Sequence, residues 1–333
     1  MLQDLPRPFF VLAPMDDVTD TVFRQVIAAC APPDLTFSEF VNVDGLMSPG
    51  HHRLITRLEK HASEPPLIAH IWGINPENFR AVADQIASGE LASELGLSQN
   101  FAGVDLNMGC PAKDVVKTGA CSALITNPAL AKTIIQATKD GLKGRLPLSV
   151  KTRLGYTKIE PAWFDFLFSS ELAMLSVHLR TKQEMSLYPA HYDELKWIKQ
   201  KRDAMAKDTL LVANGDILTY GQGLELAEKY GLDGVMIGRG VFHDPYVFSP
   251  ESPWQTMNAY SRTDLFIKHL ILFKAWSPTP DKAVARLNKY AKIYVNGFNG
   301  AKELREKIAA AQTIDEMVSI IKTFQSSEAF EAS

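Results

Sequence analysis

The sequence is poor in cysteine. Its 333 residues include only Cys30, Cys110 and Cys121, and no two of these form a Cys-x-x-Cys pair. Three isolated thiols do not make a disulfide framework, and they offer no zinc-binding spacing. We therefore expect no bound metal and a reducing, cytoplasmic environment.

Long apolar runs are also absent. No stretch approaches the ~20 consecutive apolar residues that span a bilayer. The segment Met1–Asp4 lacks the basic flank and apolar core of a secretory signal. Hydrophobic residues make up 46% of the chain and charged residues 22%, as in globular proteins with a full core. We expect no membrane partner.

Excess positive charge is missing overall but not locally. The formal net charge of −3 argues against a uniformly basic nucleic-acid binder. Between Arg262 and Lys307, however, ten Lys or Arg residues accompany four Asp or Glu residues, a surplus of six positive charges. The remainder of the chain therefore carries −9. This segregation predicts a basic surface in the last part of the chain.

Short apolar runs alternate with helical patterns as far as residue 250. Eight such strands and their helices over ~250 residues predict an α/β fold of the (β/α)8 TIM-barrel type in residues 1–250. The competing fold, an open doubly wound sheet, usually carries an early Gly-x-Gly-x-x-Gly, which is absent. The predicted strands are Phe9–Leu12, Leu35–Phe40, Pro66–Ile71, Gly103–Leu106, Leu148–Lys151, Leu172–His178, Leu210–Ala213 and Gly234–Ile237. Predicted helices include Thr21–Cys30 and two that begin at Asn75-Pro76 and Asn127-Pro128.

Residues 251–333 read as helices only, which predicts a small all-helical C-terminal domain. Two sets of residues, apolar except for His269, recur at helical spacing and share one face each, namely Phe266, His269, Leu270 and Phe273, and then Ile314, Met317, Val318 and Ile321. The segment Ser277–Pro280 predicts a turn between two of the helices. The basic surplus falls in this domain.

Polar or glycine-turn residues follow all eight predicted strands. In a barrel these positions face the active site. Each one alone has an ordinary structural explanation, but eight in succession favour a functional site. They are Ala13-Pro14-Met15, Glu39, His70, Asn107 with Cys110, Lys151 with Arg153, His178 with Arg180, Asn214-Gly215-Asp216, and Gly238-Arg239-Gly240.

Glycines follow the last two predicted strands. Gly215 and the glycines that flank Arg239 let backbone N–H groups approach an anion, and these loops commonly hold phosphate in barrels. We therefore predict a phosphate-bearing ligand, and a barrel mouth is wide enough for flavin mononucleotide (FMN). Lys151 would then stabilise negative charge on the reduced ring, and His178 would hydrogen-bond the ring or the phosphate.

Cys110 lies directly after the fourth predicted strand, in a glycine turn that a proline ends. This arrangement points the thiol out of the end of the strand. A thiol in that place is a nucleophile, a metal ligand or a proton donor, and the residues alone leave all three open. Cys30 falls on the apolar face of the first predicted helix and is expected in the core.

The sequence resembles the tRNA-dihydrouridine synthases, flavin enzymes that reduce selected uridines of tRNA to 5,6-dihydrouridine. The resemblance covers nearly the whole barrel in order and continues into the helical tail. It rests on Leu12–Met15, Ser38–Val41, Asp105–Pro111 with Gly119-Ala120, Ser149–Gly155, Val177-His178 with Arg180-Thr181, Ala213–Asp216, Asp233–Gly240, Tyr294–Phe298 and Ala301–Arg305.

The resemblance implies a two-step reaction. NADPH reduces FMN, hydride then passes from flavin N5 to uracil C6, and Cys110 donates a proton to C5. A thiol near its reference pKa of about 8.5 is mostly protonated at pH 7, so we expect Cys110 to be an ordinary thiol. Cys121 is not expected to take part. The resemblance assigns FMN binding to Ala13, Pro14, Met15, His70, Lys151, His178, Asn214, Gly215, Asp216, Gly238 and Arg239.

The same resemblance implies tRNA as the partner of the helical domain. Asn107, Arg153 and Arg180 are expected to bind the substrate at the barrel. Basic residues of the tail are expected to contact phosphates, and we expect the chain to act as a monomer. These basic residues are Lys282, Arg286, Lys289, Lys292, Lys302 and Arg305, of which Arg286 and Lys289 are the first choice. The target base must be extruded to reach the flavin.

Two departures from the family keep other functions open. His70 stands where the family usually offers glutamine to the flavin, and Leu179 replaces the usual glycine. One alternative is an FMN-dependent barrel oxidoreductase that acts on a small-molecule pyrimidine or enone. Another is a tRNA-binding protein with a silent flavin site. The presence together of four residues weighs against it, namely Cys110, Lys151, Asn107 and Arg153.

Overall fold

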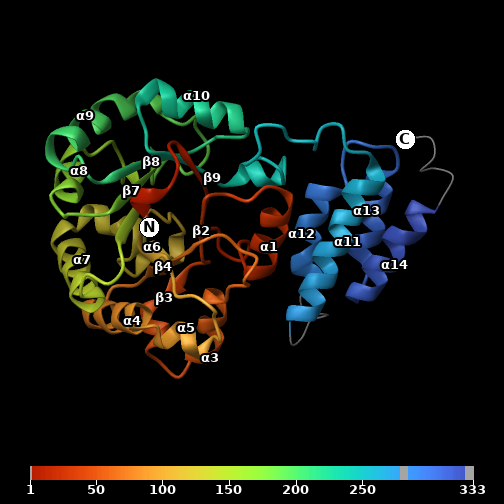
Figure 1. Cartoon of the computed structure of the whole chain (residues 1–333), viewed down its shortest axis with the longest axis horizontal. Helices are drawn as coiled ribbons and strands as arrows, with labels where there is room; N and C mark the ends of the chain where they lie inside the picture. Colours follow the sequence, from red (N-terminus) through yellow and green to blue (C-terminus); the bar gives the residue numbers. More distant parts are fainter. Residues whose placement is uncertain (1, 278–283, 327–333) are drawn as a thin grey trace.

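Eight parallel β-strands close into a barrel in the larger part of the chain (Figure 1). The computed structural model describes residues 2–277 and 284–326. Each barrel strand pairs with the next along the chain, and the last pairs back onto the first. The barrel strands are β1 (Phe9–Leu12), β2 (Leu35–Phe37), β4 (Leu67–Trp72), β5 (Gly103–Met108), β6 (Leu148–Gly155), β7 (Met174–Thr181), β8 (Leu210–Asn214) and β9 (Gly234–Ile237). The predicted (β/α)8 barrel is confirmed.

Helices follow most strands and cover the outside of the barrel (Figure 1). The side chains of Asn75 and Asn127 accept hydrogen bonds from backbone N–H groups of the first turn, and a proline takes the first helical position after each. Both predicted helix starts are therefore confirmed. The barrel helices are α1 (Thr21–Cys30), α2 (Val43–Leu46), α3 (His51–Leu54), α4 (Pro76–Ser88), α5 (Glu90–Glu94), α6 (Lys113–Lys117), α7 (Pro128–Leu142), α8 (Pro161–Phe168), α9 (Leu195–Met205) and α10 (Tyr220–Tyr230).

The ends of several strands differ from the predicted ones. β5, β6 and β7 run farther than expected because the parallel ladder continues, with Asn107 opposite Lys151 and Arg153 opposite His178. Asn107, Arg153 and also Arg180 therefore lie inside strands rather than just after them. Their side chains take fixed directions for this reason, since alternate residues of a strand face the same side.

The second predicted strand is too long. β2 ends at Phe37, and the hydroxyl oxygen of Ser38 then accepts the N–H of His70 at 2.9 Å. A side chain replaces a ladder carbonyl at this point, so regular pairing stops. Pairing with β4 resumes in the short additional strand β3 (Val41–Asn42), which the sequence did not reveal.

The barrel interior changes from apolar to polar along the strands. Inward-facing apolar side chains form one buried cluster, which includes Phe9, Val11, Phe37, Ile68, Met174, Leu210, Val212 and Met236. Farther along the inward rows of β4, β5 and β6 come His70, Asp105 and Ser149, none more than 1% exposed. Two residues beyond Asp105 and Ser149, on the same rows, Asn107 and Lys151 line the cavity described below.

Every described element after residue 258 is a helix, and α11 of this helical region packs against α1 (Figure 1). They are α11 (Ala259–Trp276), α12 (Val284–Tyr294), α13 (Ala301–Ala310) and α14 (Ile314–Gln325). Both apolar faces predicted here pack inward, although Val318 is only half-buried. The division at residue 250 remains our prediction of the domain boundary. The predicted turn Ser277–Pro280 lies outside the described residues beyond Ser277.

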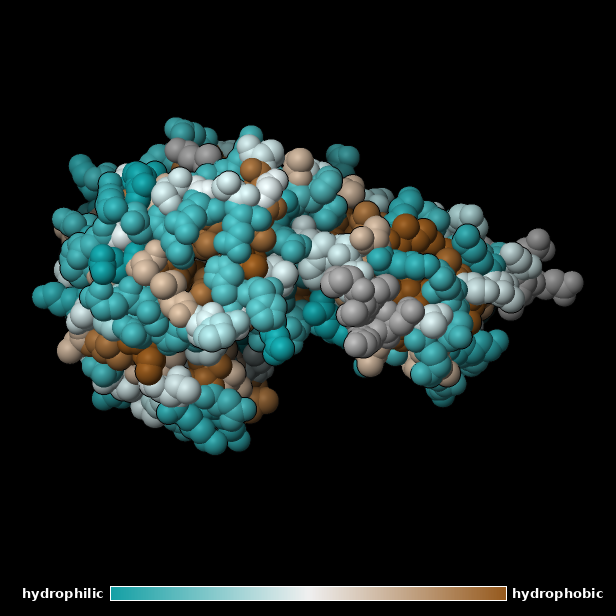
Figure 2. All heavy atoms as spheres, turned by 90° about the horizontal axis from the view of Figure 1, so that it is seen from below, coloured by the Kyte–Doolittle hydropathy of each residue, from teal (hydrophilic) through white to brown (hydrophobic). Residues whose placement is uncertain are grey.

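Hydrophilic residues cover much of the face shown in Figure 2, with separate hydrophobic patches on the barrel and on the helical region. The outline narrows between these two parts (Figure 2). Within residues 2–277 and 284–326, no helix has both the length and the apolar character that crossing a membrane requires.

Candidate active site

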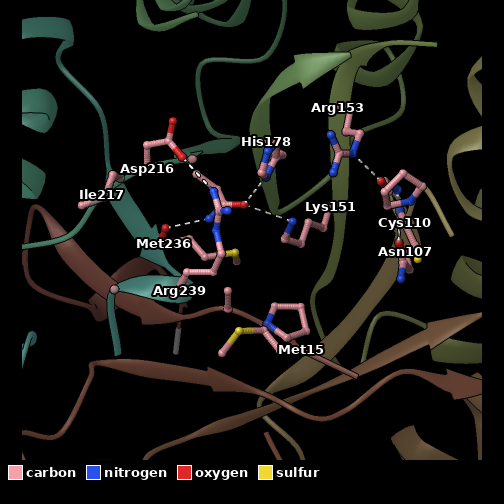
Figure 3. Close-up of a pocket in the computed structure, with 18 of the residues that line it drawn as sticks. Met15, Asn107, Cys110, Lys151, Arg153, His178, Asp216, Ile217, Met236 and Arg239 are labelled. Atoms are coloured by element: carbon pink, nitrogen blue, oxygen red, sulfur yellow. Dashed lines mark hydrogen bonds and ion pairs between the residues drawn. The ribbon is translucent and has the colours of Figure 1, made fainter. Parts of the chain in front are cut away.

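A cavity of about 520 Å³ opens at the C-terminal end of the barrel strands (Figure 3). Every residue predicted to bind the cofactor lines it, together with Asn107, Cys110 and Arg153. The site is thus at the end of the barrel where such folds keep their chemistry. Lining residues that sequence reasoning missed are Phe40, Ile217, Leu218, Met236 and His243. Ile217 and Leu218 directly follow a predicted turn, so a longer turn segment would have included them.

The loop that carries Cys110 is clamped from two sides. The Asn107 side-chain oxygen accepts the backbone N–H groups of Gly109 at 3.1 Å and of Cys110 at 3.0 Å. From β6, Arg153 Nε donates to the carbonyl oxygen of Gly109 at 2.7 Å (Figure 3). These bonds fix the thiol at the cavity wall. Because its oxygen is used in this way, Asn107 has only its NH2 group left for a ligand.

The Cys121 side chain is hydrogen-bonded to the Cys110 thiol. That Cys121 takes no part in the chemistry stays a prediction. Its backbone neighbour Ser122 donates an N–H to the Cys110 carbonyl at 3.3 Å. The hydrogen bond from the Cys121 side chain, opposed by burial, lowers the pKa of Cys110 to about 7. This pKa lies below that of the ordinary thiol that we expected. The spacing of the two cysteines in sequence did not show this contact, because the turn at Gly119 brings them together.

Lys151, His178 and Asn214 form a connected group on the neighbouring strands β6, β7 and β8. Lys151 and His178 are labelled in Figure 3. The Asn214 side-chain oxygen accepts from Lys151 Nζ at 3.3 Å and from His178 Nδ1 at 2.9 Å, while its NH2 group donates to the Met236 carbonyl. Burial lowers the pKa of Lys151 to about 8 and holds the pKa of His178 well below its ordinary value. Asn214 thus orients the ammonium group and the neutral imidazole.

Arg153 and Arg180 hold the loop that follows β7. Arg153 Nη1 donates to the carbonyl oxygens of Thr181 and Met185, both at 3.0 Å. Arg180 is 1% exposed, donates to the Tyr188 carbonyl and pairs with Asp216. Arg153 lines the cavity but Arg180 does not. The structure therefore gives Arg180 a supporting place behind the wall, and substrate binding by either arginine remains a prediction.

The two glycine turns predicted to hold phosphate lie side by side on one wall. Gly215 has a φ of 132°, and a Cβ atom there would come within 3.2 Å of the Ala190 side chain. This position therefore favours glycine. The Asp216 carboxylate pairs with Arg180 and, at 2.9 Å, with Arg239. Its charge is compensated, so an anion at this wall would meet backbone N–H groups and the exposed guanidinium of Arg239.

Two buried polar atoms among the lining residues have no hydrogen-bond partner within the described chain. They are Nε2 of His70 and Nδ2 of Asn107. His70 Nδ1 is hydrogen-bonded to Asp105 at 2.7 Å, and burial lowers the pKa of His70. An unpaired buried polar atom is costly. Both atoms are therefore candidates to pair with a bound ligand.

The cations of the helical region lie in different settings. Arg286 pairs with Asp20 at 2.6 Å, and Lys289 donates to the Asp17 carbonyl, so both face the barrel. Arg305 Nη1 donates to the Val295 carbonyl at 2.6 Å. Lys292 and Lys302 are exposed, and Lys282 lies outside the described residues. Contacts of these six residues with nucleic acid remain predictions.

Three carboxylates gather at the edge of the barrel mouth, with oxygen atoms within 4.8 Å of one another. They belong to Asp16, Asp17 and Glu39. Arg57 lies among them and forms ion pairs with all three. Burial raises the pKa of Glu39 to about 7. Because a guanidinium group already supplies the positive charge, this cluster gives no reason to revise the expectation that no metal is bound.

Comparisons with known proteins match nearly the whole chain. Residues 11–330 match the family model described as dihydrouridine synthase (Dus). A protein named probable tRNA-dihydrouridine synthase from Staphylococcus aureus (strain COL) is 46% identical over 325 residues, which cover 97% of this chain and 94% of that protein. Probable tRNA-dihydrouridine synthase 2 from Bacillus subtilis (strain 168) is 43% identical over 326 residues, covering 97% of this chain and 96% of that one.

A solved structure shares the fold at low sequence identity. Histamine dehydrogenase from Rhizobium sp. 4-9 superposes with a TM-score of 0.50 at 9% identity and covers 79% of this chain and 49% of its own. This likeness supports the barrel architecture alone. The match of the family model over nearly the whole chain, and the two bacterial relatives, go further. The chain belongs to the dihydrouridine synthase family of oxidoreductases.

Proposed function

We propose that this chain reduces selected uridines of tRNA to 5,6-dihydrouridine, with FMN as its cofactor and NADPH as the reductant. The observation that carries the proposal is the placement of Cys110. A doubly clamped loop holds its thiol at the wall of a cavity that Lys151 also lines. The names of the bacterial relatives support the same reaction and substrate.

The residues present fit FMN. The cavity of about 520 Å³ is within the range of small-molecule sites. His70 Nε2 and Asn107 Nδ2 offer unpaired polar atoms to the polar edge of a ring. The turns at Gly215 and Gly238 and the guanidinium of Arg239 offer donors to a phosphate. When bound, the flavin supplies the hydride that uracil C6 receives.

The chain's own residues supply charge and protons. Lys151 stabilises negative charge at the ring, held in place by its hydrogen bond to Asn214. The Cys110 thiol gives its proton to uracil C5. The lowered pKa, about 7, makes the thiol a stronger acid than a free cysteine, and part of it stays protonated at neutral pH. A proton donor near pH 7 needs both a retained proton and enough acidity to give it up.

The helical region supplies attraction for tRNA. Exposed Lys292 and Lys302 lie on α12 and α13 of the helical region, and Lys289 lies where α12 meets the barrel. Lysine and arginine contacts to phosphates position a nucleic acid without reading its sequence. We propose that these cations hold the tRNA while the target uridine is extruded into the cavity.

The test is to purify the protein, record its visible spectrum, and follow NADPH oxidation with and without tRNA that lacks dihydrouridine. We expect flavin absorption bands and NADPH oxidation that rises when this tRNA is added. A protein that stays colourless after incubation with FMN would contradict the proposal. Rapid reduction of free uridine without tRNA would instead support an oxidoreductase of small pyrimidines.

A further inference from the structure

A hydrogen-bonded chain of three buried side chains leads to the cavity from inside the barrel. Ser149 Oγ donates to Asp105 Oδ1 at 2.5 Å, and Asp105 Oδ2 lies 2.7 Å from His70 Nδ1. The three residues occupy neighbouring strands β6, β5 and β4, in register with one another. His70 and Asp105 are 0% exposed. The far end of the chain is His70 Nε2, which has no hydrogen-bond partner among the described residues, and His70 lines the cavity.

The direction of each hydrogen bond follows from the donors available. Ser149 has one hydroxyl hydrogen and gives it to Asp105. A carboxylate only accepts, so the hydrogen between Asp105 and His70 must be on Nδ1. In a neutral imidazole the other nitrogen then carries a lone pair and no hydrogen. Burial lowers the pKa of His70, which keeps the ring neutral near pH 7.

The ring is also held in position. Its backbone N–H donates to Ser38 Oγ at 2.9 Å, and the imidazole packs against Phe37 and Phe40 with centroid distances of 5.9 and 5.0 Å. In this orientation of the ring, Nδ1 already has its hydrogen-bond partner in Asp105. The tautomer of His70 and the direction of the Nε2 lone pair are therefore both fixed.

We propose that Asp105 and Ser149 are positioning residues that fix His70 as a hydrogen-bond acceptor for the N3–H group of the flavin. The proposal rests on the proposed function, because it requires a bound flavin. The pyrimidine edge of an oxidised flavin carries carbonyl oxygens and a single N–H donor, at N3. A fixed lone pair pairs with that donor and with none of the carbonyls.

The first test observes the tautomer directly. Nitrogen-15 NMR of histidine-labelled wild-type protein, before and after loading with FMN, should show His70 with hydrogen on Nδ1 and none on Nε2. The Nε2 resonance should move on loading as that of an acceptor does. A His70 resonance with hydrogen on Nε2 in the unloaded protein would overturn the assignment whatever the protein does with tRNA.

The second test compares the affinities of FMN and of FMN methylated at N3, measured by quenching of flavin fluorescence. In Asp105→Asn, the amide no longer forces hydrogen onto Nδ1, while the volume of His70 is unchanged. We expect FMN to bind about tenfold more weakly to this variant, the value of one hydrogen bond. The preference for FMN over its methylated form should shrink by a similar factor, because only FMN loses a hydrogen bond. Some preference should remain, because the methyl group still clashes with His70.

Ser176→Ala is the matched control. Ser176 is also 0% exposed inside the barrel, but its hydroxyl has no hydrogen-bond partner in the described chain. Its removal should leave the preference between the two flavins unchanged. An unaltered preference in folded Asp105→Asn would overturn the assignment. If wild-type protein bound neither flavin, the proposed function would fail, and this assignment with it.

Discussion

Cations of the barrel mouth and cations of the helical region are held in opposite ways. Arg153 and Arg180 are 6% and 1% exposed, and each donates to backbone carbonyls that fix its position. Lys292 and Lys302, on α12 and α13, are exposed. Burial lowers the pKa of Arg153 to about 10 and that of Lys151 to about 8. The same charge is therefore constrained in one region and solvated in the other.

This difference indicates two kinds of task. A buried, oriented charge acts strongly over a short distance because little water screens it. A solvated charge acts weakly, but it attracts a polyanion from farther away and does so in a salt-dependent manner. Substitutions in the mouth should therefore change chemistry, and substitutions on the helices should change tRNA affinity.

Among the cations of the two regions, Lys151 is expected to have the largest effect. Lys151→Met keeps much of the side-chain volume but removes the charge, so we expect reduction of bound FMN by NADPH to slow by about 10²-fold. Lys292→Met is the matched control and should leave this rate unchanged. Stopped-flow absorbance of the flavin measures both. Equal rates in wild type and Lys151→Met would show that the buried cation at the barrel mouth affects flavin reduction no more than an exposed lysine of the helical region does.

The pH dependence of the same step follows from the pKa of Lys151. Burial lowers it to about 8, so the charged form is present below that pH and is lost as pH rises through it. The wild-type reduction rate should therefore fall above about pH 8. A profile that stays flat to pH 9.5 or so would exclude a role for the ammonium charge.

Arg286 is expected to affect stability, because it joins the two regions. It pairs at 2.6 Å with Asp20, which is 2% exposed and also caps α1 by accepting the N–H of Phe23. Arg286→Ala leaves this carboxylate without its cation, and we expect the free energy of unfolding to fall by about 2 kcal/mol. Lys292→Ala should change it by less than about 0.5 kcal/mol. Urea denaturation of both variants decides between the two expectations.

The exposed lysines should affect tRNA binding only modestly. In the double variant Lys292→Ala with Lys302→Ala, we expect the slope of log affinity against log salt to decrease by about one for each lysine. Flavin content and NADPH oxidation without tRNA should stay as in wild type. A salt slope identical to that of wild type would place the tRNA elsewhere on the surface.

The smallest effect is expected at Cys121. Cys121→Ala removes the hydrogen bond that lowers the pKa of Cys110 to about 7, so that pKa should rise toward its ordinary value. Less thiolate is then present at pH 7, and alkylation of Cys110 by iodoacetamide should slow several-fold. Cys30→Ala is the control, because burial raises the pKa of Cys30 to about 12 and keeps it unreactive. An unchanged pH profile of alkylation would show that Cys121 does not act on Cys110.

Most of the barrel could be predicted from the sequence. Buried strands of a parallel sheet read as short apolar runs, and two of them, Phe9–Leu12 and Gly234–Ile237, have the predicted bounds. Cavity residues could be found because polar side chains follow those runs. Strand ends were harder, since polar residues such as Arg153 continue the ladder as well as apolar ones do.

Partners of the site residues could not be predicted. The Cys110–Cys121 contact depends on a turn, and the Asp105–His70 hydrogen bond depends on the register of two strands. Arg286 was chosen as a phosphate contact because it lies in a basic segment, but its guanidinium is paired with Asp20 across the junction of the two regions. The sequence shows which residues are charged, but it does not show which group each charged side chain contacts in the folded protein.

The central claim is that the Cys110 thiol completes the reduction of uridine in tRNA. The direct measurement is mass spectrometry of nucleosides from dihydrouridine-free tRNA after incubation with NADPH and the FMN-loaded protein, wild type or Cys110→Ala. We expect wild type to form dihydrouridine and the variant to form it at least 10²-fold more slowly, while its bound flavin is still reduced by NADPH. Dihydrouridine formation at the wild-type rate by Cys110→Ala, or none by wild type, would contradict the account.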